Sequence, residues 1–238
     1  MKLALIGYGK MGKVVEEVAL SRNHSIAAII DNPGDWSLKS DLLKQCDAAV
    51  EFTIPTVAVG NIMKCFEAGV PVVSGTTGWN DHFTEVKDYC LKMGGALLYA
   101  SNFSLGMNIF FEVNRKLANL MDPYPMYDVS IEEVHHTQKL DAPSGTAITI
   151  ANDIIANLER KTVWVNESSE NHGDLVINSV REGTVPGTHT ITYDSENDLI
   201  SIRHEAKSRR GLALGAVLAA EFIAGKKGIF TMSDLLGL

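Results

Sequence analysis

Residues 2–12 read KLALIGYGKMG, an apolar run followed by Gly7, Gly9 and Gly12 in the pattern Gly-x-Gly-x-x-Gly. The run Leu3–Ile6 has the composition of a buried strand, and Lys10–Ser21 has the apolar spacing of a helix. Between a strand and a helix, Gly9 lets the backbone approach a pyrophosphate and Gly12 lets the helix pack closely on the strand. The stretch therefore predicts the opening unit of a dinucleotide-binding fold.

A Rossmann-type, doubly wound parallel sheet is predicted for the rest of the first hundred residues. Short apolar runs alternate there with amphipathic helical stretches, which is typical of a parallel sheet covered on both faces. Helices are expected from Pro55 to Glu67 and over Asp81–Met93. The further strands are expected at Ser25–Ile30, Ala48–Thr53, Val70–Ser74 and Ala96–Tyr99.

A different pattern follows residue 106 and predicts an α+β domain with an open mixed sheet over residues 107–209. Two helices are expected, Met107–Met121 and Thr146–Leu158. The expected strands are Asp128–Val134, Val163–Val165, Val176–Arg181, Gly187–Asp194 and Asp198–His204. A last helix, Gly211–Ala224, is expected to return to the first domain, so that residues 1–106 and 210–238 form the dinucleotide-binding domain.

The cofactor contacts are predicted from the ends of the strands. Asp31 ends the second strand, where an acidic side chain binds ribose hydroxyls. Its charge would repel a 2′-phosphate, so NADH is favoured over NADPH, although Lys10 or Lys39 could reach a phosphate. Three further turns follow strands at their carboxyl ends, where this fold binds ligands. The predicted cofactor-binding residues are Gly7, Tyr8, Gly9, Lys10, Met11, Gly12, Asp31, Thr53, Gly75, Thr76, Thr77, Ser101, Asn102, Phe103 and Ser104.

A second candidate site lies in residues 133–147, which read EVHHTQKLDAPSGTA. Pro143 disfavours helix at the residue before it, and Ser144 is a natural N-cap for the helix that follows. The free backbone N–H groups at this helix start would then lie beside His135, His136 and Lys139. A helix N-terminus with cationic side chains around it suits a carboxylate, and these side chains are candidate proton donors.

The paired histidines have two other interpretations, a polar loop and a metal site. Zinc sites bring further ligands at short spacings, and the His-Glu-x-x-His arrangement is absent. No metal is therefore predicted.

Composition restricts the class of protein. The chain has 238 residues, 45% of them hydrophobic, and a formal net charge of -8, which argues against a nucleic-acid partner. Its three cysteines form no Cys-x-x-Cys pair and are expected to be free thiols in a reducing compartment. With neither a signal-peptide layout nor an apolar span of membrane length, a cytoplasmic protein without a membrane partner is expected.

Several strings resemble one family. Beside the glycine loop they are Phe52-Thr53, Gly75–Gly78, Ser101–Ser104, Glu133–Ala147, Arg181-x-Gly183-x-x-x-Gly187-x-His189 and His204-x-Ala206-x-Ser208-Arg209. On these strings the chain is similar, nearly end to end, to the 4-hydroxy-tetrahydrodipicolinate reductase (dihydrodipicolinate reductase) family of bacterial lysine and diaminopimelate biosynthesis. The string His-His-x-x-Lys-x-Asp-Ala-Pro-Ser-Gly-Thr is highly specific.

The resemblance implies NAD(P)H-dependent reduction of a small cyclic imine dicarboxylate to tetrahydrodipicolinate. Hydride would come from the nicotinamide, and His135 and Lys139 match the general acid/base and the proton donor. The positions that would hold substrate carboxylate are His136, Ser144, Gly145 and Thr146. The resemblance also implies that residues 107–209 form a substrate-binding and oligomerisation domain of a homotetramer. The chain departs from the family in shorter loops after the second strand and in Thr188, where an acidic residue is common.

Two alternatives remain open at this point. Another two-domain NAD(P)-dependent amino-acid dehydrogenase would account for residues 1–104 but not for the string from His135 to Thr146. A non-enzymatic nucleotide-binding sensor on the same fold would not need Lys139 near paired histidines.

Overall fold

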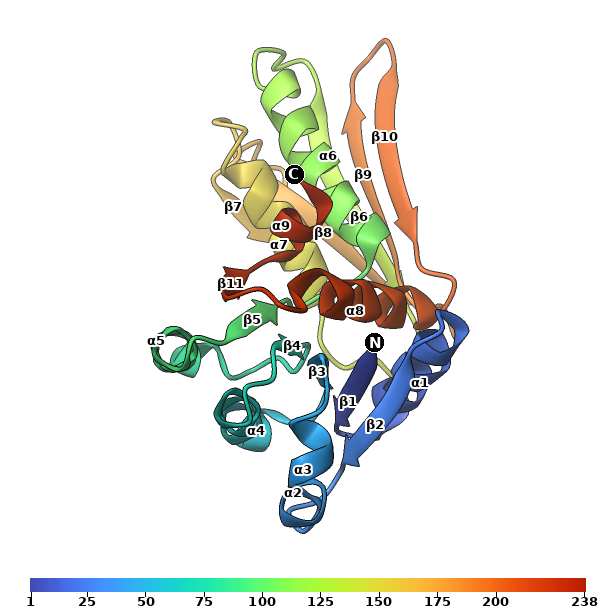
Figure 1. Cartoon of the computed structure of the whole chain (residues 1–238). Helices are drawn as coiled ribbons and strands as arrows, with labels where there is room; N and C mark the ends of the chain where they lie inside the picture. The colour runs from blue at the N-terminus through green and yellow to red at the C-terminus, as the bar shows by residue number, and fades with distance from the viewer. The chain divides into compact units, whose positions relative to one another are not determined.

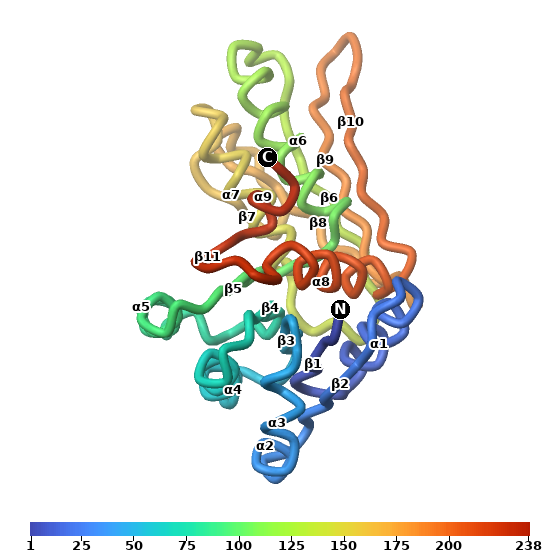
Figure 2. Tube along the Cα trace, in the orientation of Figure 1, coloured from blue at the N-terminus to red at the C-terminus, as the bar shows by residue number.

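The computed structural model describes all residues, 1–238, and the chain forms two compact units (Figures 1 and 2). Unit 1 comprises Met1–Leu105 and Arg209–Leu238, and unit 2 comprises Gly106–Ser208. No helix in either unit combines the length and the apolar character needed to cross a membrane.

Unit 1 is built on a six-stranded parallel sheet with the order β11-β5-β4-β3-β1-β2. Chain connections run from β1 to β2 on one side and through β3, β4 and β5 on the other, so a topological switch point lies between β1 and β3. The strands are β1 (Lys2–Ile6), β2 (Ser25–Ile30), β3 (Ala48–Glu51), β4 (Val72–Ser74), β5 (Ala96–Tyr99) and β11 (Gly228–Phe230).

Helices cover both faces of this sheet (Figure 1). α1 (Lys10–Ser21) and α8 (Arg210–Ile223) pack on one face, and α4 (Pro55–Glu67) and α5 (Phe83–Met93) pack on the other. Because strand side chains alternate, β1 contributes Leu3 and Leu5 to the first core and Ala4 and Ile6 to the second. The predicted doubly wound sheet and the return of the last helix to it are confirmed.

Some elements of unit 1 differ from the sequence-based expectation. Two strands are shorter than predicted, since β3 ends at Glu51 and β4 begins after Pro71. The helix expected from Asp81 starts as the 3-10 turn η1 (Asn80–His82). The unexpected elements are α2 (Asp35–Leu38), α3 (Ser40–Leu43), β11 and α9 (Met232–Leu236). All of these have at most five residues, too few to show a period in the sequence.

Unit 2 contains the predicted open mixed sheet, whose five strands have the order β10-β9-β6-β8-β7. β9 is antiparallel to β6 and β10, whereas β8 is parallel to β6 and β7. The strands are β6 (Asp128–His135), β7 (Val163–Val165), β8 (Asp174–Arg181), β9 (Thr188–Asp194) and β10 (Leu199–Glu205).

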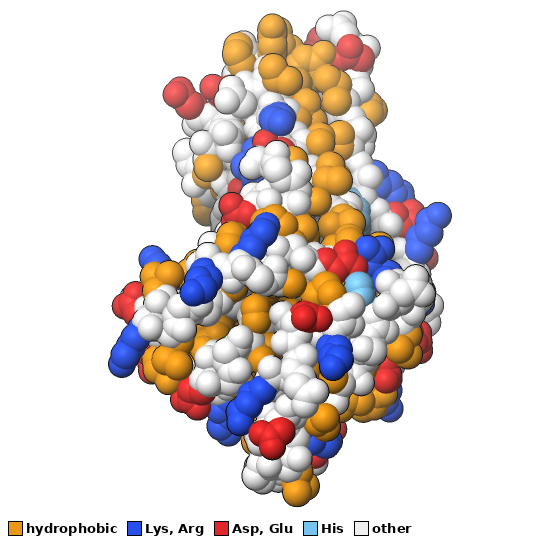
Figure 3. Space-filling view, viewed as in Figure 1, with side chains coloured by type: hydrophobic (Ala, Val, Ile, Leu, Met, Phe, Trp, Pro, Cys, Tyr) orange, Lys and Arg blue, Asp and Glu red, His pale blue; other side chains and the backbone are white.

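One face of this sheet is covered by α6 (Leu105–Met121) and α7 (Gly145–Ile155), which form a third core. α7 ends three residues before the predicted Leu158, which still packs in that core after a turn. The other face of β6 presents exposed polar side chains, Ser130 and Glu132 among them. Apolar side chains gather at the end of unit 2 shown uppermost in Figure 3, and the exposed large ones of this unit include Leu120, Tyr124, Met126, Leu199 and Ile200.

Candidate functional site

The glycine loop between β1 and α1 has the geometry of a phosphate-binding turn. Gly7 has φ +89°, and a Cβ there would lie 2.2 Å from the carbonyl oxygen of Phe52. A Cβ on Gly12 would lie 2.4 Å from the carbonyl oxygen of Gly7, whereas Gly9 faces open space. Gly9 is also the N-cap of α1 and offers no capping side chain. The first N–H groups of α1 are thus left for a ligand, and the open side of Gly9 suits a pyrophosphate.

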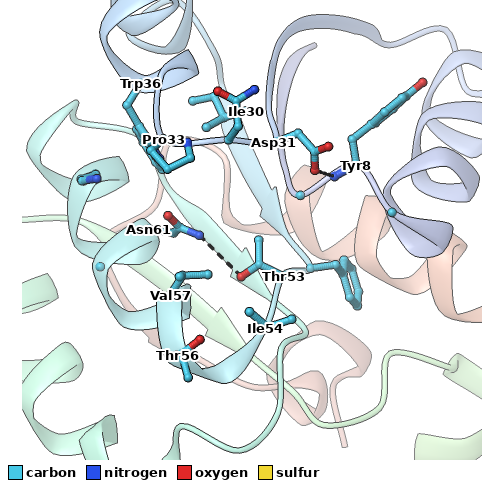
Figure 4. A pocket seen from close by; sticks show the side chains of 16 residues that line it. Tyr8, Ile30, Asp31, Pro33, Trp36, Thr53, Ile54, Thr56, Val57 and Asn61 are labelled. Atoms are coloured by element: carbon cyan, nitrogen blue, oxygen red, sulfur yellow. Dashed lines mark hydrogen bonds between the residues drawn. The ribbon is translucent and has the colours of Figure 1, made fainter.

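A cavity of about 620 Å³ lies beside this loop at the switch point of the sheet (Figure 4). Asp31 stands at its edge, where Oδ1 accepts a hydrogen bond of 2.6 Å from the backbone N–H of Tyr8. Across the cavity Asn61 donates to the hydroxyl of Thr53. Apolar walls come from the β2–α2 segment and from the start of α4, with Pro33, Trp36, Ile54 and Val57.

Lys39 is not free to bind a phosphate of the cofactor, because its ammonium group is already paired. Its Nζ pairs with Asp35 Oδ1 at 2.7 Å and donates to the carbonyl oxygen of Ile29 at 2.6 Å. The hydrogen bond from Lys39 is the largest of the causes that lower the pKa of Asp35. Asp35 Oδ2 in turn accepts the backbone N–H of Asp31. The ion pair therefore shapes the turn that carries Asp31.

A second cavity of about 350 Å³ joins three of the predicted cofactor loops. Gly75 must be glycine here, because a Cβ would lie 2.1 Å from the ring of Phe52. The two cavities share Gly9, Phe52 and Thr53. The smaller one is lined by Gly9, Lys10, Met11, Phe52, Thr53, Pro55, Gly75, Thr76 and Thr77.

The fourth predicted loop, Ser101–Ser104, lines neither cavity. Phe103 is 2% exposed and packs edge-on against Phe52, with ring centroids 5.9 Å apart. Asn102 Oδ1 accepts the backbone N–H of Ser104. In the structure the Phe103 side chain is thus part of the core beneath the cavities.

In unit 2 the buried side chains of β6 are apolar at its start and polar at its end. Val129, Ile131, Glu133 and His135 are buried and alternate with exposed Ser130 and Glu132 and half-buried Val134; Glu133 is 0% exposed. Its Oε1 accepts the Ser144 N–H at 3.0 Å, the Ser179 hydroxyl at 2.8 Å and Arg181 Nη2 at 3.1 Å.

Two histidines lie on the other oxygen of this carboxylate. Glu133 Oε2 is 3.3 Å from His135 Nδ1 and 3.8 Å from His189 Nε2. Neither contact is aligned as a hydrogen bond, so both imidazoles approach Oε2 without bonding to it. The two imidazoles meet edge to face, 5.2 Å between centroids. A Cβ on Gly187 would lie 3.0 Å from His135 Nε2, so the glycine leaves room for the ring.

Burial and neighbouring charges determine the protonation states of Glu133 and His189 in this cluster. Burial alone would raise the pKa of Glu133, but the adjacent His135 and the donors Ser144, Ser179 and Arg181 outweigh it and hold the pKa well below its usual range. Burial lowers the pKa of His189 to about 4, and the neighbouring His135 acts in the same direction. At neutral pH Glu133 is therefore a carboxylate and His189 is uncharged.

The segment after β6 carries the other predicted site residues. Lys139 Nζ bonds both carboxylate oxygens of Asp141 at 2.8 Å. His136 is half-buried, and its Nδ1 has no hydrogen-bond partner. Ser144 caps α7 as predicted, with its Oγ accepting the Ala147 N–H at 3.2 Å. Gly145, the first residue of α7, is exposed. The helix start and the end of β6 are tied together, since Ser144 also donates to Glu133.

The donor atoms of Glu133, His135 and His189 lie within 4.8 Å of one another, a spacing that a metal ion could use. The carboxylate, however, already binds the guanidinium of Arg181 and two other donors. All three donors bond to Oε1, and the charge of Arg181 beside this carboxylate disfavours a second cation at Oε2, so the arrangement fits a hydrogen-bonded cluster better than a metal centre.

No motif in the sequence assigns a role to Glu51, Glu133, Arg181 or His189. A usable signal existed for Glu133, because strict alternation along β6 places it at a buried position, where a carboxylate needs a partner. The partners themselves come from β8 and β9 through strand pairing. Arg181 and His189 belong to one of the strings that resemble the family, but nothing in the sequence pairs them with Glu133.

The depressed pKa values predict acid sensitivity. Both Glu133 and His189 have folded-state pKa values below their unfolded values, so the unfolded chain binds more protons as the pH falls. Their stabilising contribution is present at pH 7. The contribution of His189 to the free energy of unfolding is lost as the pH falls from 6.5 to about 4. The contribution of Glu133 is lost as the pH falls below about 4.5.

Urea unfolding at pH 7 and pH 4.5 should therefore show a loss of stability in which His189 accounts for about 2 kcal/mol. His189→Gln should flatten this dependence, and His172→Gln, at an exposed histidine of the same unit, should not. An unchanged slope in His189→Gln would contradict the assigned protonation state.

Comparisons with known proteins agree on one family. Residues 1–103 match the family model described as dihydrodipicolinate reductase, N-terminus, and residues 106–236 match dihydrodipicolinate reductase, C-terminus. A relative from Christiangramia forsetii named 4-hydroxy-tetrahydrodipicolinate reductase is 48% identical over 237 residues, 99% of this chain and 98% of the relative. A relative of the same name from Ralstonia nicotianae is 34% identical over 268 residues, covering 100% of both chains. The solved structure of dipicolinate-bound dihydrodipicolinate reductase from Paenisporosarcina sp. TG-14 matches with a TM-score of 0.76 and 26% identity, covering 97% of each chain.

Proposed function

This chain belongs to the dihydrodipicolinate reductase family, and we propose that it acts as a 4-hydroxy-tetrahydrodipicolinate reductase. The reaction would give tetrahydrodipicolinate for diaminopimelate and lysine biosynthesis, with NADH or NADPH as reductant. The observation that carries the proposal is the position of His135, held against the Glu133 carboxylate directly before the Lys139 segment and the capped start of α7.

Unit 1 is proposed as the dinucleotide-binding domain and unit 2 as the substrate-binding and oligomerisation domain. The glycine loop with its uncapped helix and the two adjoining cavities support the first assignment. Bound there, the reduced nicotinamide would supply a hydride. The cofactor would be held by the predicted residues of the glycine loop, by Asp31 and Thr53, and by the Gly75–Thr77 turn. The Ser101–Ser104 loop would support these residues from the core beneath the cavities.

In unit 2 the chain's own residues would bind the dicarboxylate and supply the proton. His135 and Lys139 are proposed as the proton-transferring groups, with Glu133 holding the imidazole and Asp141 holding the ammonium. The substrate carboxylates are proposed to bind His136 and the α7 start formed by Ser144, Gly145 and Thr146. The partial positive charge of a helix N-terminus favours an anion at that place.

A coupled assay tests the proposal directly. Freshly made substrate, supplied by the preceding synthase reaction, should drive oxidation of NADH or NADPH followed at the absorbance of the reduced nicotinamide. Pyridine-2,6-dicarboxylate should inhibit in competition with the substrate, because it presents two carboxylates on a planar ring. Absence of oxidation with both cofactors would refute the proposed function.

A preference for NADH is proposed from the surroundings of Asp31. The carboxylate lies at the cavity edge, and Lys39 is already paired with Asp35. A 2′-phosphate would meet a negative charge there without that lysine to offset it.

The double change Asp31→Ala with Asn32→Arg should shift the ratio of kcat/KM for NADPH over NADH upward by at least about tenfold, since it removes the repulsion and adds a phosphate ligand. Asn32→Arg alone should produce a smaller shift, because Asp31 remains. If the ratio is the same in the double variant and the wild type, Asp31 does not contact the ribose.

A homotetramer assembled through unit 2 is also proposed. The edge strand β10 exposes Leu199 at 60% and Ile200 at 40%, and edge strands of this kind pair or pack with other chains. Light scattering should report about four times the chain mass of 25.9 kDa, and a monomeric mass would refute the proposal. The three cysteines are buried and free, which supports a cytoplasmic location that cell fractionation would test.

A further inference from the structure

Glu51 is a buried acidic residue of unit 1 that has no cationic partner. It is the last residue of β3, 0% exposed, and lies in the centre of the sheet between β1 and β4. No lysine, arginine or histidine forms an ion pair with it. Burying a carboxylate is costly unless polar groups or charges compensate it, so its retention needs a physical reason.

The compensation in unit 1 comes from hydrogen-bond donors on two cofactor loops. Glu51 Oε1 accepts the Thr53 N–H at 3.0 Å, the Thr76 hydroxyl at 2.7 Å and also the Thr53 hydroxyl. Oε2 accepts the Ser74 hydroxyl at 2.7 Å. The carboxylate thus joins the turn after β3 to the turn after β4. These donors orient toward the negative charge but do not neutralise it.

The Glu51 carboxylate lies directly behind the side chains that line the smaller cavity. Thr53 and Thr76 both line that cavity and both bond to Glu51. Asp31, the proposed ribose contact, lies instead on the larger cavity, and Gly9, the proposed pyrophosphate contact, is shared by the two. A dinucleotide whose adenosine end lies by Asp31 and passes Gly9 would therefore place its nicotinamide end in the smaller cavity.

We propose that Glu51 is a positioning residue of the cofactor site whose buried negative charge favours the oxidised, positively charged nicotinamide over the reduced, neutral one. The inference rests on the proposed cofactor. In hydride transfer the C4–H bond of the dihydronicotinamide breaks, both electrons leave with the hydrogen to the substrate carbon, and the ring becomes a cation. A fixed negative charge nearby stabilises that developing cation more than the neutral ring, and so assists the transfer.

Binding measurements on the full chain test the charge separately from catalysis. Glu51→Gln keeps the size of the side chain and removes the charge. Dissociation constants for NADH, from its fluorescence, and for NAD+, by competition, should show NAD+ weakened about tenfold more than NADH. Ser74→Ala is the matched control, because it removes a hydrogen bond to the same carboxylate but leaves the charge. It should change both constants by a similar factor.

An equal effect of Glu51→Gln on NADH and NAD+ would overturn the proposal and leave Glu51 with a purely structural role. If this variant does not fold, the wild-type chain provides the test. NAD+ should bind about tenfold more tightly than benzamide adenine dinucleotide, a neutral isostere with carbon in place of the ring nitrogen, and equal affinities would overturn the proposal. A wild-type chain that binds neither NADH nor NAD+ would instead refute the proposed function itself.

Discussion

Replacing Lys139 with alanine or His135 with asparagine is expected to lower kcat by about 10²–10⁴-fold, the range that a positioned proton-transferring group contributes. His135 is held by Glu133 at 3.3 Å, and Lys139 by Asp141 at 2.8 Å, so each has a defined position from which to transfer a proton. Single-turnover and steady-state kinetics with saturating NADH would measure the loss.

NADH binding should survive in both variants, because the proposed cofactor contacts lie in unit 1 and these residues lie in unit 2. Lys116→Ala is a matched control on α6 of unit 2, where the lysine is exposed and pairs only with Glu112. It should leave kcat near the wild-type value. Wild-type turnover in Lys139→Ala or His135→Asn would show that the corresponding group transfers no proton in the slow step.

The second large effect is expected from Gly215→Ala on α8. A Cβ at Gly215 would lie 1.7 Å from the backbone carbonyl oxygen of Phe103, which is itself buried. A backbone carbonyl cannot rotate out of the way of the new methyl group as the end of a side chain can. Either α8 or the segment that carries Phe103 must therefore move. Overpacking of a core costs about 1–3 kcal/mol and occasionally more, and the upper end is expected here. Urea unfolding followed by circular dichroism would measure the loss.

Gly211→Ala on the same helix is the matched control. Nothing lies within 4 Å of a Cβ at Gly211, and alanine favours helix over glycine by up to about 1 kcal/mol. The control should therefore be neutral or slightly stabilising. If Gly215→Ala unfolds at the same urea concentration as wild type, the close approach of α8 to the Phe103 segment is not required. NADH binding in Gly215→Ala should weaken as well, because Phe103 packs on Phe52, which lines both cavities.

Local pattern predicted the elements whose apolar period or cap is visible within a single segment. Lys10–Ser21 and Ser25–Ile30 have the bounds expected from the sequence, and Ser144 caps α7 as expected. β11 could not be predicted, because three residues carry no period and its pairing partner β5 lies far away in the chain. The order of the strands, and with it the switch point, is likewise a property of pairing rather than of any one segment.

The sequence alone was enough to predict the glycine loop and the Ser144 cap of α7, since each depends on residues within a few positions of one another. It also contained the strings that identify the family. The electrostatics of the two sites, in contrast, depend on contacts between segments that are far apart in the chain. Strand pairing brings His189 and Arg181 to Glu133, and brings Ser74 and Thr76 to Glu51. The stability of a buried charge depends on the groups that neighbouring strands place around it, and these groups come together only once the sheets have formed.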